Sequence, residues 1–189
     1  MKQLRLLGFV LPPLYVIVYY ACNAAAYSAA GMTMESLFFT ITIISIFVWG
    51  WSYGFAISTN KFFTKRNYEN KKGQVFGAHS IAFVASFIIY LASTGILGGT
   101  LNTLTTYSQV QNFSDSLKFI IPLIYISQFV VQSIVAVFIT SKIYDADYKK
   151  SLNANKLAIF ILFVVYSLLA VFASFLTRAA ITAYVPGAL

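Results

Sequence analysis

Apolar residues fill five long stretches of the chain, and almost all charged residues fall in the gaps between them. The stretches cover approximately residues 6–30, 37–58, 76–99, 118–141 and 157–177. Roughly 20 apolar helical residues are needed to cross the hydrocarbon core of a bilayer, which is about 30 Å thick. No water is available there to satisfy backbone groups, so a crossing segment must be a helix. The pattern predicts an all-α integral membrane protein, a single bundle of five transmembrane helices over residues 1–189.

The first stretch follows a charged start that contains Lys2 and Arg5, a pattern that a cleaved signal peptide would also show. Its apolar region is longer than a typical signal peptide core and contains Pro12 and Pro13, so we favour an uncleaved first span. Proline lacks an amide donor and fits best in the first turn of a helix. We therefore expect the membrane helix to begin at these prolines, with residues 4–11 at the interface.

Composition agrees with a membrane location and excludes several kinds of site. Hydrophobic residues make up 59% of the chain and charged residues only 10%, whereas soluble domains carry about 25% charged residues. Cys22 is the only cysteine and His79 the only histidine. An intrachain disulfide, a CxxC redox centre and a multi-histidine metal or haem site are therefore excluded. We expect no cofactor and no metal ion.

The positive charge is distributed unevenly between the two ends of the expected spans. Of the 13 Lys and Arg residues, all but Lys118 and Arg178 lie in the N-terminus and in the loops 60–74 and 142–156. Short cytoplasmic loops accumulate Lys and Arg, so we expect a cytoplasmic N-terminus and an external C-terminus. The basic loops should contact anionic lipid headgroups. Nucleic acid is not an expected partner, because no basic stripe carries interleaved aromatic residues. In a bacterium this multi-pass protein would lie in the inner membrane.

Ionisable side chains are missing from the interior of the expected spans. All five Asp and Glu residues lie in loops or at span boundaries, which argues against proton coupling through a buried carboxylate. His79 lies near the cytoplasmic end of the third span. It could accept protons from the cytosol, but we favour an interfacial residue bonded to a loop or a headgroup. No hydrolase motif accompanies it, so no catalytic residue is assigned and the chain is not expected to be an enzyme.

Polar residues recur at helical spacing within the spans and form a candidate polar interior. Such residues share one helix face. They could line a neutral pathway, but we favour hydrogen bonds between helices, which contribute about 0.6 kcal/mol each on average. Gln128 and Gln132 are the strongest candidates for a site, because a buried amide has four hydrogen-bonding positions to satisfy. The candidate residues are Asn23, Tyr90, Tyr125, Gln128 and Gln132.

Two pairs of glycines spaced four residues apart are candidate helix-packing sites. Gly50 and Gly54 lie in the second stretch, and Gly95 and Gly99 in the third. Glycines at this spacing let a neighbouring helix approach closely. We favour packing within the monomer over packing against another subunit.

The connections on the other side of the membrane are polar. Residues 31–36 are expected to form a tight turn and residues 100–116 a polar linker. Asn112-Phe113-Ser114 matches the N-glycosylation pattern, which would apply in a eukaryotic host.

These features predict a function through partners. The favoured hypothesis is a non-enzymatic, membrane-embedded subunit of a larger transport, secretion or respiratory assembly, with membrane-protein partners or further copies of itself. The alternative is a small-molecule or lipid transporter or channel with a neutral polar pathway. A third hypothesis is an intramembrane enzyme whose cofactors come from another chain.

Overall fold

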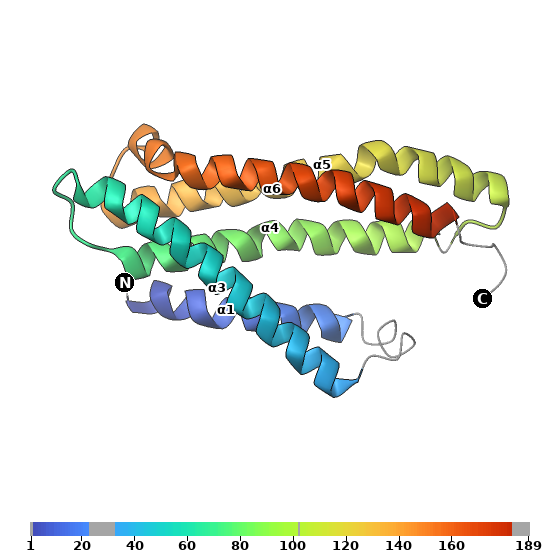
Figure 1. Cartoon of the computed structure of the whole chain (residues 1–189), viewed down its shortest axis with the longest axis horizontal. Coiled ribbons are helices and arrows are strands. Elements are labelled where there is room, and N and C mark those ends of the chain that lie inside the picture. Colours follow the sequence, from blue (N-terminus) through green and yellow to red (C-terminus); the bar gives the residue numbers. More distant parts are fainter. Residues whose placement is uncertain (1, 23–32, 102, 183–189) are drawn as a thin grey trace. The chain divides into compact units, whose positions relative to one another are not determined.

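The computed structural model describes residues 2–22, 33–101 and 103–182, which form five helices. The prediction of an all-helical chain is confirmed. Four of the helices, α3 to α6, are long and apolar enough to cross a membrane, whereas the apolar run of α1, Gln3–Val18, is shorter. The helices are α1 (Lys2–Cys22), α3 (Met34–Thr64), α4 (Lys72–Leu101), α5 (Tyr107–Tyr144) and α6 (Tyr148–Thr182) (Figure 1).

The chain divides into two compact units. Unit 1 comprises Met1–Ala85 and Gln132–Ile159, and unit 2 comprises Ser86–Val131 and Phe160–Leu189. Helices α4, α5 and α6 each contribute one part to each unit. Buried aromatic and small residues of α3 to α6, including Phe63, Ala78 and Tyr144, form the core of unit 1. The described core of unit 2 is centred on Val110, Leu117 and Ile121 of α5.

The start of α1 differs from the expectation. The helix begins at Lys2, so Pro12 and Pro13 lie inside it rather than at its first turn. Proline at position 12 cannot donate to the carbonyl of Gly8, which weakens the helix at this turn. Pro12 is fully buried, however, so packing offsets the missing hydrogen bond. Tertiary packing here outweighs the local preference of proline.

The expected linker 100–116 is wrong in its second part, because α5 begins at Tyr107. The side chain of Gln109 explains the early start. Its Oε1 accepts hydrogen bonds from the backbone amides of Thr105 and Thr106, at 3.0 and 3.2 Å. These bonds occupy amides that would otherwise be free at the helix N-terminus. The glycosylation tripeptide 112–114 consequently lies inside a helix.

The expected loop 142–156 is also largely helical. Only three residues separate α5 from α6, and the first of them, Asp145, has a positive φ of 48°. Asp147 then caps α6, because its Oδ1 accepts a 2.6 Å hydrogen bond from the amide of Lys150. Likewise Thr33 caps α3 by accepting from the amide of Ser36. Polar residues near the apolar stretches thus start helices where loops were expected.

Helix α1 makes a very close backbone contact with α4 within unit 1. A Cβ atom added to Gly8 would lie 2.7 Å from the Cα atom of Gly77. A Cβ atom added to Gly77 would collide with the carbonyl group of Leu4. Beside this crossing the ring of Phe9 packs on those of Trp49 and Phe76, with centroids 6.0 and 4.7 Å apart. Only glycine fits at the crossing point.

Candidate functional site

Buried polar side chains from four helices gather in the core of unit 1. Ser52, Thr59 and Asn60 come from α3, and the others from α4, α5 and α6. Ser151 and Asn155 are four residues apart, a spacing that puts them on one face of α6. We call this group the polar cluster; its members are Ser52, Thr59, Asn60, His79, Ser80, Thr140, Ser151 and Asn155, all buried.

A chain of polar contacts in the polar cluster links α3 with α4 and α6. Thr59 Oγ1 donates to Asn155 Oδ1 at 3.3 Å and lies 3.5 Å from His79 Nε2. Asn155 Nδ2 in turn donates to the carbonyl of Ser151 at 2.8 Å. Because the Thr59 hydroxyl hydrogen is directed at Asn155, the geometry favours the His79 tautomer that donates from Nε2.

His79 is therefore buried within unit 1, whereas the sequence had led us to expect a residue bonded to a loop or a headgroup. Its side chain is only 1% exposed and its ring packs 5.4 Å from that of Phe55. Its Nδ1 atom has no hydrogen-bond partner among the described residues. The correction has a physical reason, since the small hydroxyl of Thr59 on the facing helix leaves room for the imidazole and satisfies its other nitrogen.

Asn60 joins three segments at one end of unit 1. Its Oδ1 accepts hydrogen bonds from Tyr144 Oη, at 2.6 Å, and from the backbone amide of Lys71, at 2.9 Å. Lys71 Nζ donates to the carbonyl of Ile143 at 2.9 Å, and the rings of Phe63 and Tyr144 stack 3.9 Å apart. We call Asn60, Lys71 and Tyr144 the Asn60 junction. It fixes the α3–α4 connection against the end of α5.

Cations at this end of unit 1 are held mainly by aromatic rings. Lys72 Nζ donates to Tyr53 Oη and Lys150 Nζ to Tyr68 Oη, both at 3.0 Å. The guanidinium of Arg66 lies 3.7 Å from the ring centroid of Phe62. Phenol and ring partners add no negative charge, and the acidic residues at this end, which include Glu69 and Asp147, are fewer than the cations. The arrangement is therefore suited to contact with anionic headgroups.

The residues of the candidate polar interior are divided between the two units and the part of the chain outside the described residues. Gln128 and Gln132 are buried, at 2% and 1% exposure, but they belong to units 2 and 1 respectively. Tyr90 and Tyr125 are half-buried in unit 2, and Asn23 lies outside the described residues. The Tyr125 ring faces that of Tyr166 at 6.3 Å, and the Tyr166 hydroxyl lies 3.3 Å from Ser86 Oγ. The sequence did not identify the polar cluster of unit 1 as a group, because its residues come from four helices, some within the apolar stretches (Ser52, His79, Ser80 and Thr140) and some beyond them (Thr59, Asn60, Ser151 and Asn155).

The four candidate packing glycines have open space around them. In the part of the chain that the structure describes, a Cβ atom added to Gly50, Gly54, Gly95 or Gly99 would meet nothing within 4 Å. The close approach occurs instead at Gly8 and Gly77, which were not singled out. The same criterion could have identified Gly77, because Gly73 and Gly77 are also four residues apart.

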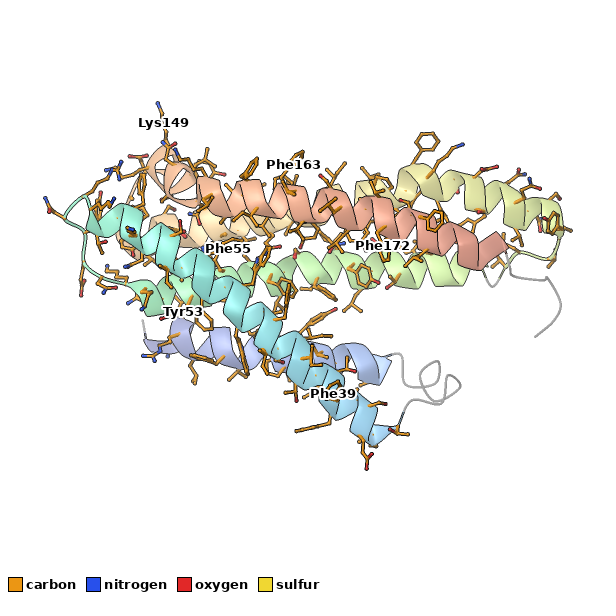
Figure 2. All side chains as sticks on the ribbon, viewed as in Figure 1. Phe39, Tyr53, Phe55, Lys149, Phe163 and Phe172 are labelled. Carbon is orange, nitrogen blue, oxygen red and sulfur yellow. The ribbon has the colours of Figure 1, made fainter. Side chains whose placement is uncertain are left out.

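An apolar groove runs between α5 and α6 in unit 2. Its volume is about 690 Å³. Ile126 and Val130 line it from α5, and Phe163 and Ala170 from α6, with Lys118 at one end. Figure 2 shows Phe163 on α6, where 55% of its side chain is exposed. The groove is thus a surface feature of this helix pair.

No protein-family model matches this chain, and no curated protein and no solved structure matches it significantly.

Proposed function

We propose that the chain is a non-enzymatic, multi-pass membrane protein that acts as an embedded subunit of a larger transport, secretion or respiratory assembly. It crosses the membrane five times, with a cytoplasmic N-terminus and an external C-terminus. The observation that carries the proposal is an exposed face of α3 that combines glycines with large apolar side chains.

This face is continuous along most of α3. Its residues recur at spacings of three, four and seven, so they share one side of the helix. Phe39, near the N-terminal end of α3, is 66% exposed (Figure 2). We call this surface the α3 open face; it comprises Phe39, Ile43, Ile46, Phe47, Gly50, Gly54 and Ile57, all exposed.

The glycines of the α3 open face favour a helix as its partner. A glycine within a helix costs roughly 0.5–1 kcal/mol relative to alanine. In the membrane, helices associate by close packing, and small residues at four-residue spacing permit it. Gly50 and Gly54 make no such contact with any described residue of the chain. A transmembrane helix of another subunit, seated between Phe47 and Ile57, would use them.

Adding bulk to the α3 open face should therefore remove a partner without harming the chain. Among the described residues, a Cβ atom at position 50 or 54 meets nothing within 4 Å, and the surrounding positions of the α3 open face are exposed. We therefore expect normal insertion and thermal stability for Gly50→Leu and Gly54→Leu. Overpacking costs about 1–3 kcal/mol at a packed interface, which weakens partner binding roughly 5- to 150-fold. The measurement is co-purification from native membranes, quantified by mass spectrometry.

Phe38→Trp supplies a control, because Phe38 is exposed on α3 outside the α3 open face. It should leave the co-purified proteins unchanged, while Gly54→Ala should have an intermediate effect. If both leucine variants retain the partners of the native chain, the proposal of a docking face on α3 is wrong.

A small-molecule or lipid transporter or channel is the alternative function, and the polar cluster favours it. Eight buried polar residues from four helices could belong to a neutral pathway. Solute flux into vesicles that contain only this purified chain would support the alternative. Recovery only together with other proteins would support the subunit proposal.

The orientation is tested by reporter fusions. Fusions within residues 60–71 and at residue 146 should report the cytoplasm, and fusions after Ala188 should report the outside. The reason is the concentration of Lys and Arg in the N-terminus and in residues 60–74 and 142–156, which contain these fusion points. A C-terminal reporter in the cytoplasm would contradict the model of five spans.

A further inference from the structure

We propose that the groove between α5 and α6 binds one acyl chain of an acidic phospholipid, with its phosphate at Lys118. This inference rests on the proposed membrane location but not on the partner at the α3 open face. The occupant follows from the length of the groove, its lining and the charge at its end.

The groove has the length of one leaflet. It extends along α5 from Lys118 to Val130 and along the antiparallel α6 from Phe175 to Phe163. Twelve residues of helix rise about 18 Å, and half of the hydrocarbon core measures about 15 Å. A chain anchored at the headgroup level would therefore lie in the groove to about the middle of the bilayer.

The lining is mainly apolar over this length, and its uncharged polar members are Tyr166, Ser167 and Ser174. Ile126 and Val130 on α5 face Phe163 and Ala170 on α6 across the groove. The rings of Phe129 and Phe163 meet edge to face at 5.8 Å, which fixes the wall at the deep end. An acyl chain is matched to such a surface, whereas a polar solute would lose its hydrogen bonds to water there.

The charge lies at the end where a headgroup would be. No charged residue occurs from 119 to 141, so Lys118 marks the boundary of the apolar part of α5. On α6, Arg178 follows Phe175 by three residues. Lys118 and Arg178 are the two cations that the sequence places on the outer side. A lysine at this level directs its ammonium toward the headgroups, and basic sites beside transmembrane helices bind acidic lipids.

A partner helix is the competing occupant of this groove. It would pack against the apolar walls, but only a helix with an acidic side chain at the matching end would also use Lys118. An acidic phospholipid supplies the apolar chain and the negative charge in every molecule.

The full-length protein in nanodiscs tests the proposal. The probe is phosphatidylglycerol with a diazirine in one acyl chain, diluted into phosphatidylcholine, and the labelled residues are mapped by mass spectrometry. We expect labelling of the groove walls, residues 118–130 and 163–175, in preference to the rest of α5 and α6. A phosphatidylcholine probe with the same diazirine-labelled acyl chain should label these walls about fivefold less. The reason is that one cation near an anionic headgroup strengthens binding by about this factor.

Two variants distinguish the contact with the lipid headgroup from the contact with the acyl chain. Lys118→Gln should lower phosphatidylglycerol labelling to the level of phosphatidylcholine, whereas Lys142→Gln, at the other end of α5, should not change it. Ser167→Phe adds a ring to the groove rim and should abolish wall labelling. Ile134→Phe is the matched control, because Ile134 is exposed on α5 outside the groove.

Equal labelling by the two lipids, or labelling unaffected by Ser167→Phe, would overturn the proposal. So would an unlabelled groove accompanied by crosslinked dimers, which would assign the groove to a second copy. Failure of the subunit proposal is a separate result, since it is measured by partner loss in the Gly54→Leu variant. Ser167→Phe should keep every partner.

Discussion

Gly77→Ala is expected to be strongly destabilising although it adds only one methyl group. The new Cβ atom would collide with the backbone carbonyl of Leu4, and backbone cannot move aside as a side chain can. Overpacking typically costs about 1–3 kcal/mol, and a clash between two backbones belongs at the upper end. A loss of about 2–3 kcal/mol lowers the melting temperature of a chain of this size by roughly 4–12 °C. Thermal unfolding in detergent measures the effect.

Gly73→Ala is the matched control one turn earlier on α4. Its Cβ would lie 3.1 Å from Cδ of Arg5, part of a flexible and exposed side chain that can shift. Alanine also stabilises a helix relative to glycine, by about 1 kcal/mol. Gly73→Ala should therefore be neutral or stabilising. Equal melting temperatures for Gly77→Ala and Gly73→Ala would disprove the close crossing of α1 and α4.

Asn60→Leu should destabilise the protein about as much as Gly77→Ala. The cause here is the loss of a hydrogen-bond acceptor, not a steric clash. The substitution leaves Tyr144 Oη and the amide of Lys71 without their acceptor. A buried donor that loses its partner costs about 1–3 kcal/mol, so we expect a total loss of about 2–4 kcal/mol. Tyr144→Phe removes a single donor and should cost about 1 kcal/mol.

The double variant provides the critical measurement at the Asn60 junction. In Asn60→Leu/Tyr144→Phe no tyrosine hydroxyl remains unpaired. Its destabilisation should therefore be smaller than the sum of the two single effects, by about 0.5–3 kcal/mol. Strictly additive changes in unfolding free energy would show that the two side chains do not interact.

Sequence patterns predicted the helices better than their ends. The apolar stretches identified α3 to α6, because burial in lipid requires long runs without charge. The ends depend on single side chains: Gln109 starts α5 about ten residues before the apolar stretch, and Asp147 starts α6. Neither residue differs in type from the polar residues around it, so composition alone could not identify it as a cap.

The sites were harder to predict because they depend on pairs of helices. The burial of His79 follows from the facing Thr59, twenty residues earlier in the sequence. Position 77 accepts only glycine because the backbone of Leu4 lies against it. Leu4 belongs to α1, which the sequence shows only as an apolar run. Spacing within one helix identified Gly50 and Gly54 as packing residues, yet it could not show whether the neighbour belongs to the same chain.

The order in which the polar cluster is completed has a consequence for biosynthesis. Thr59 and Asn60 leave the ribosome long before Tyr144 and Asn155, which are their partners on α5 and α6. Until residue 155 has been translated, the α3 segment lacks at least one of these partners. A nascent chain that ends before residue 144 keeps Thr59 and Asn60 without both late partners, which distinguishes it chemically from the finished protein.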